Sequence, residues 1–362
     1  MVEVPFVSVV VLSWNQLDKT LNCINSLLKS DYLNFEIILI DNGSKSEIVN
    51  SLKSNFKNNK KIKLVFNGKN FGSAEGRNIG FRNSSNKSKY IAFFDNDTII
   101  LKKYISKLVN ILEKNKNVFG VNGAFYNFKE NYPSRNTTLT LVSFDAPYYA
   151  NSLKGNPLRK AVALTGSGCM YNKEFISPEP FFSDYFFGGE EVYLGLLVYL
   201  KGGICMKVLD AQYEHLSQNV FQGNRSPLAS FHATKNRLMS LFLFFEKKTL
   251  FKIFPLILTS QLFYLFYFPK LIPSKLRAYF WLISNYKKLK KKRNELQKQR
   301  KVPDSEIIKY MSGKFQDPNI IKNKICNKTL SLLNNLFLIY CKLLKIKTKE
   351  FFINEKRTRR LV

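Results

Sequence analysis

Two aspartates separated by one asparagine follow an apolar run in the stretch YIAFFDNDTII, residues 90–100. Carboxylates with this spacing at the end of a buried strand can coordinate a divalent cation such as Mg²⁺ or Mn²⁺, which can hold the phosphates of a ligand. Asp and Asn are also ordinary turn formers, so Asp95 and Asp97 by themselves are equally compatible with a turn. The rest of the sequence has to distinguish a metal site from a turn.

Two further features could contribute chemistry. The acidic pair Glu190-Glu191 follows two glycines and precedes the apolar run VYLGLLVYL. A carboxylate is favoured at a helix N-terminus, so the pair is also compatible with helix-start electrostatics alone. His215, one of two histidines, comes just after the apolar run 204–209. It becomes a candidate metal ligand only if the fold brings it to the aspartates.

The elements that would position these side chains alternate between strands and helices. Apolar runs of strand length occupy residues 6–12, 35–40, 62–66 and 90–94, and stretches with helical spacing lie between them. This alternation predicts an α/β fold with a mostly parallel sheet and helices on both faces. Ligands bind at the carboxyl ends of such strands. We therefore expect Asp41, the asparagines near position 70 and the two aspartates to converge on one rim.

Six segments in one order carry a resemblance to a known family: VSVVVLSWNQ, EIILIDNGS, NFGSAEGRNIG, YIAFFDNDTII, FFGGEEVYLGL and EHLSQN. Together they resemble the inverting nucleotide-sugar glycosyltransferases of family 2, and among these the rhamnosyltransferase-like bacterial members. The resemblance covers roughly residues 5–240 and implies a GT-A type, Rossmann-like domain. The joint order is more specific than any single motif and favours the metal interpretation of the aspartates.

The resemblance implies a role for each matching residue. The positions that correspond to the nucleobase and ribose pocket are Ser13, Trp14, Asn15 and Asp41. Those on the diphosphate side are Asn70, Gly72, Arg77 and Asn78. Asp97 would bind Mg²⁺ or Mn²⁺ together with the donor diphosphate, Asp95 would contact the ribose or the ion through water, and His215 would complete the metal site.

The acidic pair departs from the family pattern. Family members usually read Gly-Glu-Asp, whereas this chain reads Gly189-Glu190-Glu191, and Tyr193 replaces an aspartate that usually follows. Glu191 occupies the position of the catalytic base, with Glu190 as the second catalytic candidate. A glutamate is one methylene longer, so the base must reach differently. A chain that has lost catalysis and serves as a binding or scaffold subunit is the alternative that this departure keeps open.

The resemblance implies the reaction in outline. We expect an inverting transfer of a sugar from a nucleoside diphosphate donor, dTDP-rhamnose or a UDP-hexose, to a glycan or lipid-linked acceptor in cell-surface polysaccharide synthesis. The acceptor pocket is expected in variable loops such as residues 125–160.

Charge divides the chain unevenly. The net charge is +31, of which +23 lies from Lys235 onward, where 30 Lys and Arg face 7 Asp and Glu. The sequence therefore predicts a glycosyltransferase domain over residues 1–238 and a helical, basic, aromatic-rich region over 239–362. Long apolar stretches between its basic runs, and the lack of a nucleic-acid-binding motif, argue against nucleic acid and favour an anionic membrane surface as the partner.

The depth of membrane contact is a separate question. Between Lys252 and Lys270 lie 17 uncharged residues, at the lower limit of the roughly 17–25 that span a bilayer, and Pro255 interrupts them. We expect an interfacial or shallowly inserted helix, with a spanning helix and a soluble helical hairpin as the alternatives. Widely spaced cysteines, odd in number, and an N-terminus unlike a signal peptide predict the cytoplasmic face of the cell membrane.

Overall fold

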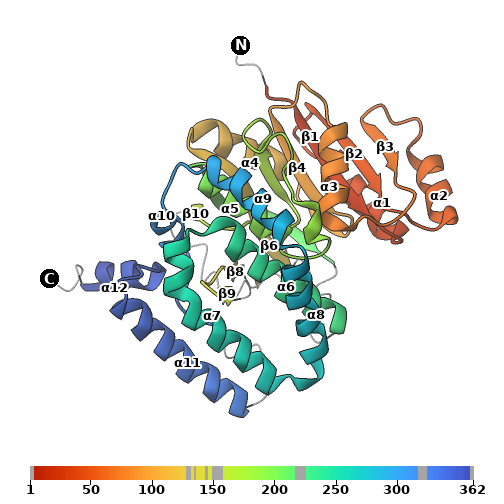
Figure 1. The fold of residues 1–362 in the computed structure, drawn as a ribbon. Coiled ribbons are helices and arrows are strands. Elements are labelled where there is room, and N and C mark those ends of the chain that lie inside the picture. The colour runs from red at the N-terminus through yellow and green to blue at the C-terminus, as the bar shows by residue number, and fades with distance from the viewer. Residues whose placement is uncertain are drawn as a thin grey trace. The chain divides into compact units, whose positions relative to one another are not determined.

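The computed structural model describes residues 4–127, 132–133, 136–142, 146–148, 158–216, 226–316 and 324–358. The chain forms two compact units (Figure 1). The first comprises Met1–Ser134, Ala150–Val198 and Gly203–Phe221, and the second comprises Arg135–Tyr149, Tyr199–Gly202 and Gln222–Val362. The composition-based boundary at residue 238 falls inside α6 (Pro227–Phe244), which lies wholly in the second unit.

A ten-stranded sheet in the order β10-β12-β6-β11-β4-β1-β2-β3, with β5 and β7 added to β12 and β6, forms the centre of the first unit. Its strands are β1 (Val7–Ser13), β2 (Phe35–Asp41), β3 (Ile62–Phe66), β4 (Tyr90–Asp95), β5 (Thr98–Ile100), β6 (Val118–Asn127), β7 (Tyr132–Pro133), β10 (Leu158–Lys160), β11 (Cys169–Asn172) and β12 (Ile204–His215). The run β3-β2-β1-β4 is parallel, and so is β6 with β12, whereas β11 is antiparallel to both β4 and β6. The predicted mostly parallel sheet is confirmed.

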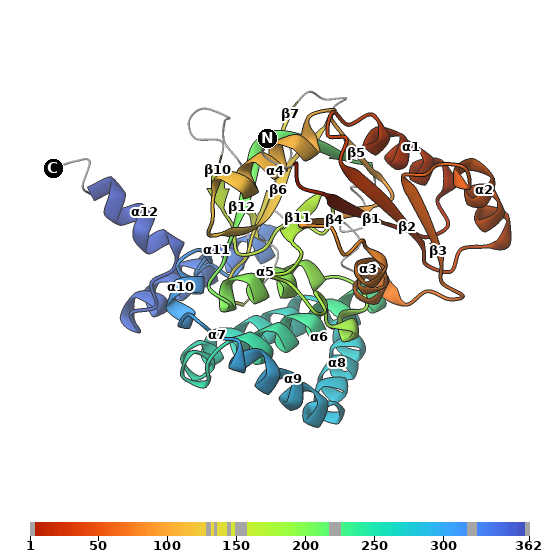
Figure 2. The same ribbon diagram turned by 90° about the horizontal axis from the view of Figure 1, so that it is seen from above.

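Helices cover both faces of this sheet (Figure 2). Val7, Val9 and Val11 of β1 point into a hydrophobic core that also contains buried residues of α1 (Leu17–Leu28), α2 (Ser46–Phe56) and α4 (Tyr104–Lys114). Alternate residues of a strand point to opposite faces, so Val10 lies on the other side, where α3 (Gly72–Asn83) packs. The predicted two-faced coverage is confirmed.

Two local features bring the acidic pair and the histidine to the sheet edge. Gly188 and Gly189 adopt the left-handed φ values of +74° and +86°, and α5 (Glu190–Leu200) begins directly after them. β12 pairs in parallel with β6, with a register shift between Val208 and Gln212, and its end also pairs with β5, so that His215 lies opposite Thr98. The pairing with β5 thus brings the histidine to the segment that contains the two aspartates.

The second unit is mainly helical, as predicted. Its helices are α6, α7 (Lys247–Tyr267), α8 (Ile272–Ser284), α9 (Tyr286–Lys298), α10 (Asp304–Ile308), α11 (Lys324–Leu343) and α12 (Lys349–Thr358), and β8 (Asn136–Thr138) pairs with β9 (Ala146–Tyr148). α7 and α11 run antiparallel: the Tyr340 hydroxyl donates to the Lys252 carbonyl at 2.8 Å, and the Tyr267 and Thr329 hydroxyls lie 2.7 Å apart.

The close approach of α3 to β1 generates a prediction. A Cβ added at Gly80 would lie 2.3 Å from Cγ1 of the fully buried Val10. We expect Gly80→Ala to lower the free energy of unfolding by about 1–3 kcal/mol, because overpacking outweighs the gain in helix propensity. Urea unfolding would measure it. The control is Gly68→Ala, where nothing lies within 4 Å of the added Cβ. Equal stability of the two variants would contradict the packing argument.

Candidate active site

Three parallel strands end side by side on one rim of the sheet. Ser13 of β1 pairs with Asp41 of β2, and Leu12 of β1 pairs with Asp95 of β4. The Ser13 hydroxyl lies 2.8 Å from the Thr20 hydroxyl, which fixes it at the start of α1. The predicted convergence of these strand ends is therefore what the fold produces.

The loops after β1 and β2 form one polar network. Asn15, which has a positive φ of 55°, donates from its backbone N–H to the Ser44 hydroxyl at 2.9 Å, and its Oδ1 accepts from the Lys45 N–H at 2.9 Å. Asp41 Oδ2 accepts from the Ser44 N–H at 3.1 Å, whereas Asp41 Oδ1 is buried without a hydrogen-bond partner among the described residues. Trp14 is exposed beside this network. A hydrogen-bond donor is therefore the natural occupant next to Asp41.

The segment before α3 is held by side-chain amides. Asn70 Oδ1 accepts from the Gly72 N–H at 2.8 Å and from Asn42 Nδ2 at 3.0 Å. Gly72 has a φ of +81°, and a Cβ there would lie 2.4 Å from the Phe186 carbonyl oxygen. That carbonyl also accepts from the Ser73 N–H at 2.6 Å. The start of α3 is thereby fastened to the segment that leads into the acidic pair.

Asp95, Asp97 and His215 form a potential cation site. One donor atom from each lies within 4.8 Å of the other two. His215 Nε2 is 3.1 Å from Asp97 Oδ1 and 3.5 Å from Asp95 Oδ2, and the Leu216 N–H donates to the Asp97 carbonyl at 2.9 Å. The histidine therefore meets both aspartates, the condition under which it counts as a ligand candidate.

The donor set fits a hard divalent cation. Carboxylate oxygens with one imidazole nitrogen suit Mn²⁺ or Mg²⁺. Apart from the contact with His215 Nε2, the buried Asp97 Oδ1 has no polar partner among the described residues, and a bound cation would supply one. Burial lowers the pKa of His215. The hydrogen bond with Asp95 and the charges of Asp95 and Asp97 raise that pKa by more, so the net shift is upward. A bound cation and a proton would compete for the same imidazole nitrogen.

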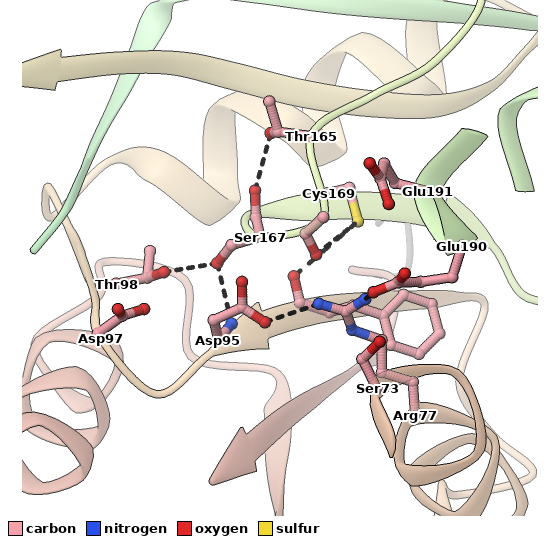
Figure 3. Close-up of polar contacts among 12 residues, drawn as sticks. Ser73, Arg77, Asp95, Asp97, Thr98, Thr165, Ser167, Cys169, Glu190 and Glu191 are labelled. Carbon is pink, nitrogen blue, oxygen red and sulfur yellow. Dashed lines mark hydrogen bonds and ion pairs between the residues drawn. The ribbon is translucent and has the colours of Figure 1, made fainter. Parts of the chain in front are cut away.

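Arg77 connects the aspartates to the acidic pair (Figure 3). The guanidinium is almost completely buried, with Nη2 2.6 Å from Asp95 Oδ1 and Nη1 2.7 Å from Glu190 Oε1. Burial raises the pKa of Asp95, but the charge of Arg77 and the contacts with His215 outweigh it and hold the pKa below its usual range. One cation thus fixes the end of β4 and the start of α5 side by side.

The remaining predicted residues of α3 and α5 divide into two kinds. Asn78, which is fully buried, binds the backbone of Phe181 in both directions, with Nδ2 donating to its carbonyl at 2.9 Å and Oδ1 accepting from its N–H at 3.1 Å. Glu190 is buried on Arg77, whereas Glu191 is half-buried and accepts from the Gly189 N–H at 3.0 Å. The two glutamates therefore occupy different environments.

Three hydroxyl groups that support the segment with the two aspartates were not predicted from the sequence. The Asp95 N–H donates to the Ser167 hydroxyl at 2.9 Å, which lies 2.5 Å from the Thr98 hydroxyl, and the Thr165 hydroxyl donates to the Ser167 carbonyl at 3.0 Å (Figure 3). The only local signal was the stretch TGSGC, whose glycines flank Ser167. Half of the segment 125–160, which is predicted to form the acceptor pocket, lies outside the described residues.

Comparison with known proteins identifies the first unit. Residues 8–177 match the family model described as Glycosyl transferase family 2. Residues 8–177 therefore belong to glycosyltransferase family 2. This span contains β1 to β4, the two aspartates, Arg77 and the supporting Ser167, whereas Glu190, Glu191 and His215 lie beyond it. The rhamnosyltransferase-like subtype stays a prediction.

Similar proteins extend the match in sequence and in fold. The chain is 37% identical over 113 residues to an uncharacterized glycosyltransferase of Rickettsia felis, covering 31% of this chain and 18% of the relative. It is 29% identical over 208 residues to one of Haemophilus influenzae, covering 53% and 62%. The crystal structure of GalNAc-T7 with UDP, GalNAc and Mn²⁺ has a similar fold, with a TM-score of 0.56, 15% identity, and coverage of 73% of this chain and 51% of the other. The chain thus spans less than two thirds of each.

The ion pairs of the buried Arg77 generate a stability prediction. We expect Arg77→Met to lower the free energy of unfolding by about 3–5 kcal/mol, because the buried Glu190 and the partly buried Asp95 would be left without their cation. Arg82→Met is the matched control on the same helix, since Arg82 pairs with Glu75 and Glu179 while about half exposed. It should cost less than about 1 kcal/mol. Chemical denaturation of both variants measures the difference, and similar losses would mean that the buried bridge has no special weight.

Proposed function

We propose that this chain is an inverting glycosyltransferase that moves a sugar from a nucleoside diphosphate donor to an acceptor hydroxyl. The observation that carries the proposal is the meeting of Asp95, Asp97 and His215 within 4.8 Å at the end of β4, with both aspartates in the segment that matches glycosyltransferase family 2. Negative charge develops on the diphosphate as it leaves and has to be neutralised. The three side chains are suited to do this by holding a cation.

The donor would lie along the rim formed by the ends of β1, β2 and β4. Ser13, Trp14, Asn15 and Asp41 are proposed to bind the nucleobase and ribose, and the buried Asp41 Oδ1 would accept a hydrogen bond from one of them. Asn70 and Gly72 are proposed on the diphosphate side, with Arg77 and Asn78 behind them as groups that hold the pocket walls. This last role follows from their burial and from their contacts with Asp95, Glu190 and Phe181.

A divalent cation, Mn²⁺ or Mg²⁺, would be held by Asp97, Asp95 and His215, and when bound it neutralises charge on the leaving diphosphate. Asp95 is kept ionised by Arg77 and is thereby ready to accept a positive partner. The GalNAc-T7 structure, which shares the fold, was determined with UDP and Mn²⁺, and this supports the same ligand class here.

Glu191 is proposed as the catalytic base. It would accept the proton of the acceptor hydroxyl while that oxygen attacks the anomeric carbon, and the bond between this carbon and the diphosphate oxygen would break in the same step. One displacement inverts the anomeric configuration. Glu190, which is paired with Arg77, is proposed as a positioning residue that fixes the first turn of α5 beside Asp95.

The finer parts of the proposal concern the substrates and the setting. We propose dTDP-rhamnose or a UDP-hexose as donor and a glycan or lipid-linked acceptor in the synthesis of a cell-surface polysaccharide. The net charge of +23 from Lys235 onward supports a site of action at the cytoplasmic face of the cell membrane, with peripheral or shallow attachment.

Variants of the two glutamates should differ in their effects on turnover and on stability. Glu191→Gln should lower turnover by about two to four orders of magnitude, because it removes the proposed base. Glu190→Gln should lower the unfolding temperature as well, because it removes a partner of Arg77. Donor turnover and thermal unfolding of both variants would be measured. Full turnover in Glu191→Gln would exclude Glu191 from the mechanism.

Metal-dependent donor binding should require Asp97. A nucleoside diphosphate at about one hundred times its Kd stabilises its target by about 2.7 kcal/mol, a shift of several degrees in Tm. UDP and dTDP, each with Mn²⁺ or with EDTA, would be tested on the wild type, on Asp97→Ala and on the control Asp31→Ala, which alters an exposed carboxylate. We expect a shift that requires Mn²⁺ and is lost only in Asp97→Ala. A shift that survives EDTA, or that Asp97→Ala retains, would refute the metal site, and no shift for any nucleotide would favour a binding or scaffold subunit.

A further inference from the structure

The second unit presents an unusual apolar surface on α7. Its exposed hydrophobic residues recur at intervals of three and four, which places them on one side of the helix: Phe251, Phe254, Leu258, Leu262 and Phe266. Phe251 is 83% and Phe266 80% exposed. The opposite side is buried, through residues such as Ile253 and Leu256. α7 therefore has two apolar sides, of which the described part of the second unit covers only one.

The same arrangement recurs on two other helices of this unit. α11, which runs antiparallel to α7, buries Leu330 and Phe337 and exposes an apolar stripe of Ile325, Leu332, Leu336, Ile339 and Leu343. α8 exposes Leu276, Phe280 and Ile283, with Phe280 at 72%. Single exposed hydrophobic residues are normal on protein surfaces, but three such stripes in one helical unit mark a binding surface.

Basic side chains accompany these stripes. Lys252 and Lys270 bracket the apolar stretch of α7, and both are exposed. α9, which follows α8 after one residue, lines a hollow with Lys287, Lys290, Lys291, Asn294, Glu295 and Lys298. The region from Lys235 onward has a net charge of +23. Exposed aromatic and aliphatic side chains flanked by lysines are complementary to the acyl boundary and the phosphate groups of an anionic bilayer.

Polar contacts on the covered side of α7 argue for a helix lying on the bilayer. α7 is the one helix among the described residues that is long and apolar enough to cross a membrane, and a third of its most apolar stretch is buried. Its Gln261 Oε1 accepts from the Tyr279 hydroxyl of α8 at 3.0 Å, and its Tyr264 hydroxyl donates to Gln316 Oε1 at 2.8 Å. A spanning α7 would have to give up these partners in hydrocarbon, where unpaired polar groups are costly.

We propose that α7, α8 and α11 form a lipid-binding face that dips into the headgroup and acyl boundary of an anionic membrane. In this arrangement the exposed stripes enter the boundary, and the lysines of α9 and those at the ends of α7 contact lipid phosphates. This interaction uses none of the residues of the candidate active site. It can therefore hold or fail independently of the transferase proposal.

Vesicle binding of the full chain tests the face directly. The wild type should co-sediment with vesicles of phosphatidylcholine and phosphatidylglycerol, and only weakly with phosphatidylcholine alone. The variant Phe251→Ser/Phe254→Ser/Phe266→Ser should bind the mixed vesicles at least about tenfold more weakly. The control Leu33→Ser alters an exposed leucine of the first unit and should bind like the wild type. Undiminished binding of the triple variant would overturn the proposed face.

A second measurement keeps the test valid if the triple variant unfolds. In a background that carries Trp14→Phe and Trp281→Phe, which removes both native tryptophans, Phe266→Trp should be quenched by lipids brominated near the glycerol end of the acyl chain, whereas Leu33→Trp should not. Quenching strongest at the bilayer centre, with resistance to alkaline extraction, would overturn interfacial binding in favour of a span. Light scattering without lipid gives the remaining outcome: a dimer that the triple variant converts to monomer would assign the face to a second copy of this chain and overturn the lipid proposal.

Discussion

The buried charge of Arg77 is the interaction on which the candidate active site depends. A guanidinium that is only 2% exposed is tolerable because two carboxylates neutralise it, and these belong to different segments, Asp95 at the end of β4 and Glu190 at the start of α5. Each carboxylate is in turn oriented by the same guanidinium. The proposed metal site and the segment with the proposed base are therefore both held by Arg77. Neither segment can shift without disturbing the other.

This anchor requires α3 to lie very close to its surroundings. Gly72, Gly76 and Gly80 recur every four residues and so share one face of the helix, where added Cβ atoms would meet Phe186, Leu12 and Val10. The small face lets α3 approach β1 closely enough for Arg77 to reach between the two carboxylates. Asn78 completes the arrangement by holding the backbone of Phe181, ahead of the acidic pair. The helix therefore acts as a rigid support for both acidic segments.

The second unit differs from the first in its packing, because its helices have more apolar surface than their contacts with one another bury. α7 and α11 each cover one stripe with protein and leave a second to the surroundings. With most of the chain's excess positive charge in the same region, the unit has the composition of an amphiphile. In the first unit, the buried apolar residues pack on the two faces of the sheet.

The sequence by itself determined the elements and their class. The apolar runs of β1 to β4, the glycines before α5, the paired aspartates and the basic helical region could all be predicted, because strand and helix periodicity and turn chemistry are local properties. Partners distant in sequence were decided only by the tertiary structure. It brought His215 to Asp97 through the pairing of β12 with β5, set Ser167 behind Asp95, and bound Arg77 to two carboxylates. The tertiary structure also decided which side of α7 is buried. The sequence of a helix that is apolar on both sides does not determine this, because burial depends on which other parts of the chain pack against the helix.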